Sequence, residues 1–188
     1  MDYRLPDDRM PEAEVSLRPA FHVMGLQRKE SPVRVAVDGA QIRVHGSQVF
    51  PILPFLKDHG WEQVGQKGKN PWQGWYERGS QKLRIHSRSG VGDVVASVRG
   101  TRLRAECKSG PLIKKPGSKE YPKLRQALGQ VLTVDRVKPR DHLIVAAPLS
   151  PKFRQLADKW RTAPLVQRCG IGIVLVGRDG TVEGLDLT

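Results

Sequence analysis

Hydrophobic residues at three- and four-residue spacing predict three helices. One stripe predicts a helix over about Glu120 to Thr133 with a single core-facing side. A second predicts a helix that begins near Pro151, and a third indicates a helix within Gln48 to His59, where two prolines obscure the start. The apolar residues of the three stripes are, in the same order, Leu124, Ala127, Leu128, Val131 and Leu132; Phe153, Leu156, Ala157 and Trp160; and Val49, Ile52, Leu53, Phe55 and Leu56.

Shorter apolar patterns predict the strands. The runs His142 to Ala147 and Ile171 to Val176 are continuously hydrophobic, which is typical of strands that are buried on both faces. A final segment, Thr181 to Leu185, predicts an edge strand. Buried strands that alternate with helices imply an α/β fold with a central mixed β-sheet flanked by helices. Three earlier alternating segments, joined by tight glycine turns, predict a meander; they are Lys82 to Arg88, Asp93 to Val98 and Arg102 to Lys108.

The N-terminal region lacks such periodicity. Residues 1 to about 31 carry several prolines among mixed charges, which predicts an irregular arm. Alternating residues on both sides of Asp38-Gly39 then predict a β-hairpin from Val33 to Val37 and from Gln41 to His45. We therefore expect two parts: residues 1–46 as an N-terminal arm with a hairpin extension, and residues 47–188 as the main domain.

The charge of the chain indicates its class of partner. Among 188 residues, 32 Lys and Arg oppose 19 Asp and Glu, which gives a formal net charge of +13. A surplus of this size favours binding to a polyanion, either nucleic acid or an acidic membrane surface. No apolar run approaches the ~20 residues that span a bilayer, and no helix pairs a broad apolar face with a lysine-rich one. We therefore expect nucleic acid as the partner and no membrane.

Other function classes lack their motifs. The two cysteines, Cys107 and Cys169, form no CxxC pair and no cluster with histidines, which argues against a zinc module. The sequence contains no GxSxG, no P-loop and no GxGxxG, so serine hydrolase, NTPase and Rossmann functions have no support. The first residues lack the plan of a signal peptide, and free thiols suit a reducing interior. These features predict a cytoplasmic protein.

Charged side chains occur in the meander where a sheet normally places packing residues. Asp93 opens the middle strand, and Glu106 and Lys108 share one face near the end of the next, because side chains alternate along a strand. A tight hairpin brings Asp93 beside Glu106, since opposite residues on adjacent strands lie about 5 Å apart. Two close carboxylates repel unless a proton or a divalent cation lies between them, and Mg²⁺ prefers such oxygen ligands. The pattern predicts phosphodiester hydrolysis, with a solvated charged hairpin face as the alternative.

These residues in their context resemble the PD-(D/E)XK nuclease superfamily, which has the restriction-endonuclease-like fold. The resemblance rests on Asp93 at the start of a strand, Glu106-x-Lys108 near the end of the next, then a helix and a buried strand, and it covers about Gln48 to Val176. A glycine, not proline, precedes the aspartate. The resemblance implies that Asp93 and Glu106 hold Mg²⁺, for which Mn²⁺ would substitute. It also implies that the carbonyl of Cys107 adds a ligand and that Lys108 serves catalysis.

The same resemblance implies two further groups. Many members of the superfamily add an acid from the first helix, a place that Asp58 or Glu62 would fill. Relatives often carry a Gln-xxx-Tyr or similar pair in the helix after the lysine. Gln126 and Gln130 look like that element, with glutamine in place of tyrosine, and we expect Gln126 to help order the site. The alternative is a solvent-facing pair of residues that favour helix formation.

Basic residues near the proposed site predict a surface that holds a phosphate backbone against the acidic centre. Trp72, Trp75 and Tyr76 either stack on unpaired bases or cover a small core beneath a loop. The residues that we expect to bind nucleic acid are Lys69, Trp72, Arg88, Arg104, Lys114, Lys115, Lys119 and Lys123.

The combined prediction is a Mg²⁺-dependent nuclease. DNA is favoured over RNA because the resembling superfamily acts mostly on DNA, and an endonuclease is the expected form. The alternative is a catalytically inactive nucleic-acid-binding protein, or a nuclease-fold subunit of a larger DNA-processing complex. A homodimer would supply two sites for cutting both strands.

Overall fold

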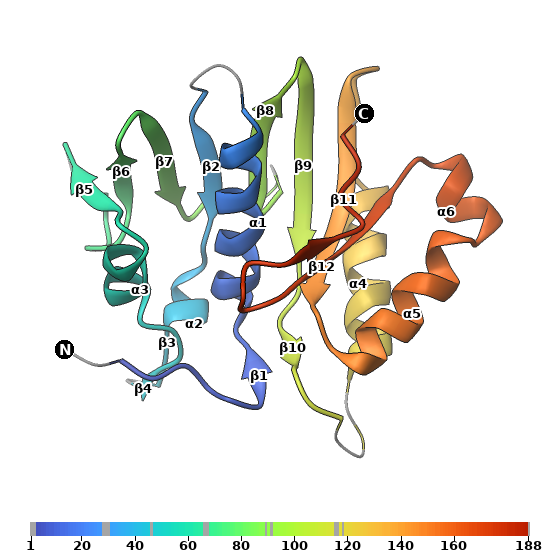
Figure 1. Cartoon of the computed structure of the whole chain (residues 1–188), viewed down its shortest axis with the longest axis horizontal. Helices are drawn as coiled ribbons and strands as arrows, with labels where there is room; N and C mark the ends of the chain where they lie inside the picture. The colour runs from blue at the N-terminus through green and yellow to red at the C-terminus, as the bar shows by residue number, and fades with distance from the viewer. Residues whose placement is uncertain are drawn as a thin grey trace.

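The computed structural model describes residues 3–27, 31–45, 47–65, 68–88, 90, 92–114, 117 and 119–187. Within these ranges the main element is a mixed sheet of nine strands in the order β13-β12-β11-β9-β8-β2-β7-β6-β5 (Figure 1). The strands are β2 (Val33–Ala36), β5 (Glu62–Val64), β6 (Gly74–Arg78), β7 (Gln81–His86), β8 (Val94–Val98), β9 (Thr101–Cys107), β11 (Asp141–Pro148), β12 (Gly172–Val176) and β13 (Val182–Glu183).

Short strands and six helices complete the described chain. Two small antiparallel pairs join β1 (Arg9–Met10) with β10 (Gly110–Pro111) and β3 (Arg43–Val44) with β4 (Ser47–Gln48). The helices are α1 (Glu12–Leu26), α2 (Gly39–Ile42), α3 (Ile52–Asp58), α4 (Glu120–Leu132), α5 (Pro151–Arg161) and α6 (Pro164–Arg168). Within the described ranges, no helix is both long enough and apolar enough to cross a bilayer.

Helices cover the two faces of the sheet unequally. Helix α1 lies across the middle of one face, whereas α4 and α5 lie on the opposite face beside β11 and β12 (Figure 1). Two hydrophobic cores result, one beneath α1 and one beneath α4 and α5. Strands β11 and β12 contribute to both cores, which confirms that these apolar runs are buried on both faces. The α/β class with a mixed central sheet flanked by helices is likewise confirmed.

The predicted meander is only partly correct. Strands β8 and β9 form the expected antiparallel hairpin, with Val94 opposite Ala105. Strand β7, however, does not neighbour β8, because β2 lies between them and pairs parallel with β7 and antiparallel with β8. Val33 and Val35 of β2 are fully buried, so this strand is central to the sheet rather than part of an appended hairpin.

The predictions for the N-terminal region are wrong. The expected irregular arm contains helix α1, which includes Pro19 and buries a stripe of apolar residues against the sheet. That burial outweighs the hydrogen bond that proline removes from a helix. In the expected hairpin, the side chain of Asp38 instead caps α2 by accepting from the Ala40 N–H at 3.0 Å. The main core contains residues from both sides of the predicted boundary between positions 46 and 47.

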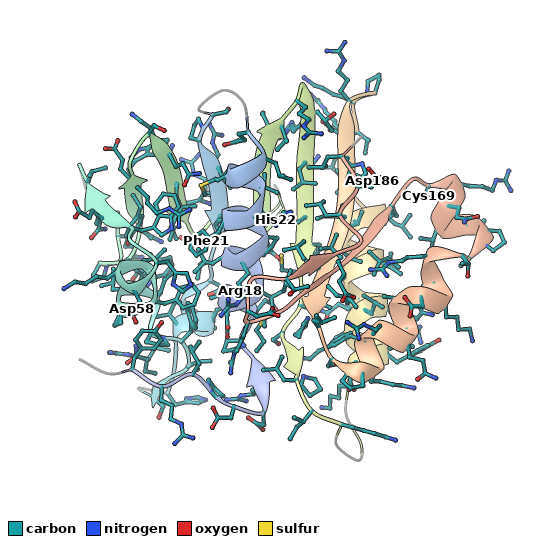
Figure 2. All side chains as sticks on the ribbon, viewed as in Figure 1. Arg18, Phe21, His22, Asp58, Cys169 and Asp186 are labelled. Carbon is teal, nitrogen blue, oxygen red and sulfur yellow. The ribbon has the colours of Figure 1, made fainter. Side chains whose placement is uncertain are left out.

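Aromatic contacts join α1 to α3. The ring of Phe21 stacks on Phe55 and Trp61, with ring centroids 6.1 Å and 5.5 Å apart. Phe21 lies on the side of α1 that faces α3, where Asp58 is located, while Cys169 lies far from this contact beside α6 (Figure 2). These contacts fix α1, and therefore its first turn, relative to the sheet.

Candidate functional site

Asp93 lies directly before β8 and is held beside Glu106 by two hydrogen bonds to β9. Its backbone N–H donates to the Ala105 carbonyl at 2.8 Å, and its Oδ2 accepts from the Cys107 N–H at 2.7 Å. These two partners are the residues on either side of Glu106. The structure therefore places the Asp93 carboxylate next to Glu106, as the hairpin predicted.

Lys108 completes the arrangement from the end of β9. Its Nζ lies 2.9 Å from Glu106 Oε1, and its backbone N–H donates to the Ala146 carbonyl of β11 at 2.9 Å. The whole residue is only 6% exposed. The predicted Glu-x-Lys pair thus meets at a fixed, buried point where β9 meets its parallel neighbour.

Glu12, in the first turn of α1, is a further acid that the sequence interpretation missed. Its Oε1 lies 3.8 Å from Lys108 Nζ and accepts from Gln41 Nε2 at 3.1 Å, while its Oε2 accepts from the Ser109 N–H at 3.3 Å. The ammonium of Lys108 therefore lies between two carboxylates from different elements. The apolar spacing that follows Pro11 in the sequence was the available signal for this helix.

The two acids named for the first helix lie elsewhere. Asp58 is the last residue of α3. Glu62 lies in β5, the strand at the opposite edge of the sheet from β13, where it pairs with Glu77. Neither belongs to the element that reaches Lys108, because the prediction took α3 as the first helix and α1 was not foreseen.

Burial and neighbouring charges set the protonation of the site. Burial first, and the Glu106 carboxylate second, raise the pKa of Asp93 to about 7, although the Cys107 N–H and Lys108 oppose the shift. Burial lowers the pKa of Lys108, but Glu12 and Glu106 outweigh that effect, so the net shift is upward. Lys108 therefore stays protonated as an ammonium. Asp93, in contrast, is partly protonated near neutral pH, and a nearby cation would stabilise its ionised form.

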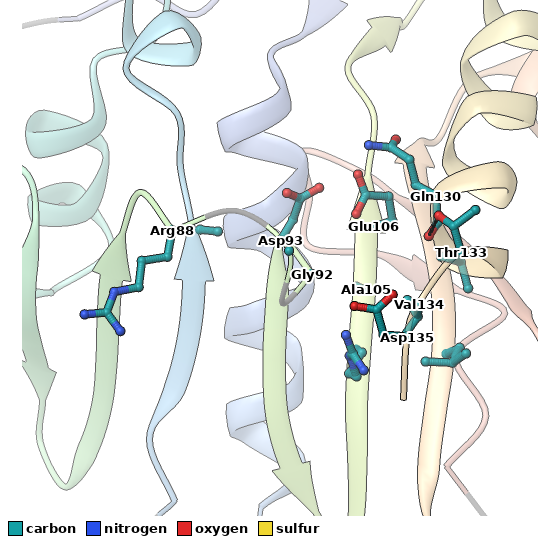
Figure 3. Close-up of a pocket in the computed structure, with 14 residues that line it drawn as sticks. Arg88, Gly92, Asp93, Ala105, Glu106, Gln130, Thr133, Val134 and Asp135 are labelled. Atoms are coloured by element: carbon teal, nitrogen blue, oxygen red, sulfur yellow. Dashed lines mark hydrogen bonds between the residues drawn. The ribbon is translucent and has the colours of Figure 1, made fainter. Parts of the chain in front are cut away.

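A cavity of about 340 Å³ opens beside Asp93 and Glu106. Gln130 of α4 lines it, and Figure 3 shows the Asp93, Glu106 and Gln130 side chains on the same side of the cavity, with Arg88 directed away from them. Gln126 is exposed on α4 and is not among the described residues that line this cavity. The helix thus presents the second glutamine of the pair to the acids, whereas the prediction assigned that role to the first.

A second cavity, of about 570 Å³, lies on the Glu12 side of the site. Lys119 and Lys123, both predicted to bind nucleic acid, line it together with Ser109. Lys123 Nζ donates to the Ser109 carbonyl at 2.8 Å and to its Oγ at 2.6 Å. Cations therefore flank the acidic centre on this side.

The other predicted nucleic-acid contacts are spread more widely. Arg88 and Arg104 line the first cavity, and Lys114 is exposed on the loop after β10. Lys115 lies outside the described residues. Lys69 is exposed on the loop before β6.

Trp72 is 7% exposed and belongs to the main core, so its ring fits the packing alternative and cannot stack on a base in this structure. Tyr76 is likewise buried, and its hydroxyl donates to the Trp72 carbonyl at 2.7 Å. Trp75 differs, because it is only half-buried and the guanidinium of Arg84 lies over its ring.

The possible metal donors are oxygens. Among the described residues, no group of three or more His, Cys, Asp and Glu side chains is arranged to hold a metal ion. Two carboxylates, those of Asp93 and Glu106, converge, and the backbone carbonyl of Cys107 lies on the same side of β9 as its N–H, which bonds Asp93. Burial raises the pKa of the Cys107 thiol well above its usual value, so sulfur is not a ligand here.

No family model, curated protein or solved structure matches this chain.

Proposed function

We propose that this protein is a Mg²⁺-dependent nuclease that hydrolyses phosphodiester bonds, with DNA as the favoured substrate. The observation that carries the proposal is that the buried Lys108, directly after β9, lies between Glu12 of α1 and Glu106 of β9, with Asp93, directly before β8, held beside Glu106. Cavities on both sides of that point include cationic side chains in their linings, Arg88 and Arg104 in the first and Lys119 and Lys123 in the second, and Asp135 also lines the first. Such an arrangement can hold a phosphate chain beside an acidic centre.

The arrangement supports the resemblance to the PD-(D/E)XK superfamily and a restriction-endonuclease-like core. An aspartate precedes β8, the Glu-x-Lys segment ends the adjacent β9, and α4 then leads to β11, which pairs parallel with β9. Glu12 takes the place of the acid from the first helix. The match of residue types and elements is closer with Glu12 than it was with the acids proposed from sequence.

The donor set fits a hard cation. Asp93 and Glu106 supply carboxylate oxygens and Cys107 supplies a carbonyl, which are ligands that Mg²⁺ accepts with water in its remaining positions. Burial and, second, repulsion from Glu106 raise the pKa of Asp93, and a divalent cation between the two carboxylates would counter both effects. When bound, Mg²⁺ would supply Lewis-acid activation of water and neutralisation of phosphate charge.

Lys108 and its partners have distinct tasks in this proposal. Because Lys108 remains an ammonium, it donates hydrogen bonds to the attacking water or the phosphate, and its positive charge stabilises the negative charge there. It does not accept a proton. Glu106 and Glu12 hold its Nζ in place from two sides. Gln130 lies where its amide can orient water or phosphate in the adjoining cavity.

A cleavage assay tests the proposal. Wild type, Asp93→Ala and Lys108→Ala would be incubated with plasmid or branched DNA and with RNA, in Mg²⁺ or Mn²⁺ and in EDTA. We expect metal-dependent cleavage by the wild type and a loss of at least about a hundredfold in both variants. Lys159→Ala, on the exposed side of α5, is a matched control that should cleave normally. Cleavage that survives both site substitutions would refute the assignment.

The alternative function is nucleic-acid binding without cleavage. Two observations favour it: no three-ligand metal group occurs among the described residues, and the Lys108 ammonium already neutralises Glu106. The same assay separates the two functions, since a non-cleaving protein would retain DNA without product in every metal tested.

A further inference from the structure

One face of the sheet carries a row of arginines, of which the catalytic proposal uses Arg104 alone, as part of the lining of the cavity at Asp93. Residues of β6, β7, β2, β8 and β9 that alternate with the buried ones point away from α1. The strand registers place five of them at one level across five adjacent strands. In spatial order this arginine row is Trp75, Arg84, Arg34, Val95 and Arg104.

The arginine row runs directly beside the candidate acids. Two residues further along the same strands lie His86, Ala36, Asp93 and Glu106, with His86 opposite Ala36 and the Ala36 N–H donating to the Asp93 carbonyl at 2.7 Å. Two residues of a strand correspond to about 7 Å. The row therefore leads across the open face of the sheet toward the edge of the acidic centre.

The positive charge of the row is concentrated. Arg34 and Arg84 are exposed and directly opposite each other on parallel strands, and no acid occupies a position in the row. Like charges opposite each other destabilise a sheet, so the fold gains nothing from this pair. At the end of the row, Nη1 of Arg104 donates to the Arg136 carbonyl at 3.0 Å, while its Nε is buried and has no hydrogen-bond partner among the described residues. An anion on this face would relieve the repulsion between Arg34 and Arg84.

An aromatic ring completes the row. Trp75 is half-buried, and the guanidinium of Arg84 lies over it at 5.3 Å from the ring centroid. Both residues line a cavity of about 360 Å³ together with His86 and Arg88, and Arg88 also lines the cavity at Asp93. Burial and the three neighbouring arginines lower the pKa of His86, so it stays neutral. Its Nδ1 accepts from the Arg88 N–H at 3.1 Å, which leaves Nε2–H to donate to a base.

We propose that the arginine row binds a single-stranded segment of nucleic acid that crosses the strands of the sheet. Arg84, Arg34 and Arg104 contact backbone phosphates over the roughly 14 Å between β7 and β9, and Trp75 extends the row by one further strand. Trp75 stacks on an unpaired base. A base inside a duplex is already stacked on its neighbours, so it cannot make this contact without leaving the duplex. The inference rests on the proposed function for its polyanionic substrate, and it adds which part of that substrate lies next to the acids.

A binding experiment in EDTA tests the row without requiring cleavage. Fluorescence anisotropy would measure the affinity of the full chain for a labelled single strand and for the matching duplex. For Arg34→Ala/Arg84→Ala we expect at least a tenfold weaker affinity for the single strand, and a slope of affinity against salt that falls by about 1.4. For Trp75→Ala we expect a loss of about tenfold on the single strand and little change on the duplex, with Trp75→Phe largely restoring the affinity.

The control is Lys159→Ala/Arg168→Ala, which removes two charges from exposed positions on α5 and α6. It should keep single-strand affinity within about twofold of wild type. Circular dichroism and thermal melting would verify that each variant is folded. Equal losses in the control and in the arginine variant would overturn the proposal, and so would a Trp75→Ala loss that is the same on single strand and duplex.

Failure of this inference is distinguishable from failure of the proposed function. A protein that cleaves DNA but binds single strands equally well without the row refutes the row alone. A protein that binds through the row but never cleaves refutes the nuclease and supports the row.

Discussion

The two halves of the sheet differ in how they are covered. On β11 and β12 both faces are packed, one under α1 and the C-terminal segment and the other under α4 and α5, and the strands are apolar nearly throughout. On β7, β2 and β8 only the α1 face is packed, and the other carries arginines and the carboxylate of Asp93. The first half therefore provides stability, while the second retains charges that cost stability and are available to a ligand.

The most direct test of this difference between the two halves is to introduce the same charged residue into each. Val145 of β11 is fully buried beneath α4 and α5, so Val145→Asp should lower the free energy of unfolding by at least about 4 kcal/mol. Val95 of β8 lies on the open face between Arg34 and Arg104, so Val95→Asp should change the free energy of unfolding by less than about 1 kcal/mol. Urea denaturation followed by circular dichroism measures both. Equal losses would show that the open face is packed.

A second test contrasts two acids on one helix. Glu14 is fully buried and ion-paired with Arg18 at 2.7 Å and Arg178 at 3.0 Å, so Glu14→Gln should cost about 3 kcal/mol by leaving two half-buried guanidinium groups without their carboxylate. Glu12 is partly exposed and faces Lys108 instead. Glu12→Gln should therefore cost less than about 1 kcal/mol but slow cleavage by about tenfold to a hundredfold.

Stability and cleavage would be measured on both variants. A Glu12→Gln protein that cleaves at the wild-type rate would remove Glu12 from the site. Activity in Glu14→Gln should follow its folded fraction, because Glu14 binds α1 to the turn after β12 and touches none of the proposed catalytic groups.

The three acids of the site show how far the sequence could predict this molecule. The β8–β9 hairpin depends on a local signal, the Arg99-Gly100 turn in which both residues adopt positive φ, so Asp93 and Glu106 could be placed together from the sequence. Glu12 reaches Ser109, which is 97 positions away, and no local pattern encodes such a contact.

The position of β2 within the sheet could not be predicted from the sequence either. Its pairing with β7 and β8 depends on residues about 50 and 60 positions along the chain, and the Asp38-Gly39 signal next to it suggested a hairpin. The segments that form α4, α5, β11 and β12 were predicted correctly. Their buried positions follow from the spacing of apolar residues within each segment, so no distant contact has to be known.

The loss of stability caused by a charge in the open half of the sheet can be measured through the titration of Asp93. The pKa of this carboxyl is about 7 when folded and 3.8 in its ordinary state, so the folded protein binds more protons between these values. The free energy of unfolding therefore falls as pH rises from about 4 to 7, and the loss is complete above pH 7. Asp93→Asn, which keeps an oxygen for the Cys107 N–H, should be more stable than wild type by about 1–3 kcal/mol at pH 8 and equal to it near pH 3. Chemical denaturation at several pH values checks this, and a difference that is independent of pH would contradict the assignment.

The smallest expected effect is the stabilisation of the charged half by its metal. Mg²⁺ would bind the folded protein and not the unfolded chain, so a concentration about ten times its Kd should add ~1.4 kcal/mol to the free energy of unfolding. For a chain of this size, that corresponds to a rise in Tm of about 3–6 °C. The increase should disappear in Asp93→Asn, which offers one carboxylate fewer to the ion, and should persist in Asp158→Asn, whose carboxylate lies on the exposed side of α5. Because the metal competes with the proton on Asp93, the increase should also shrink as pH falls below 7. A metal-induced shift of equal size in both variants would place the ion elsewhere and leave the β8–β9 acids without their proposed role.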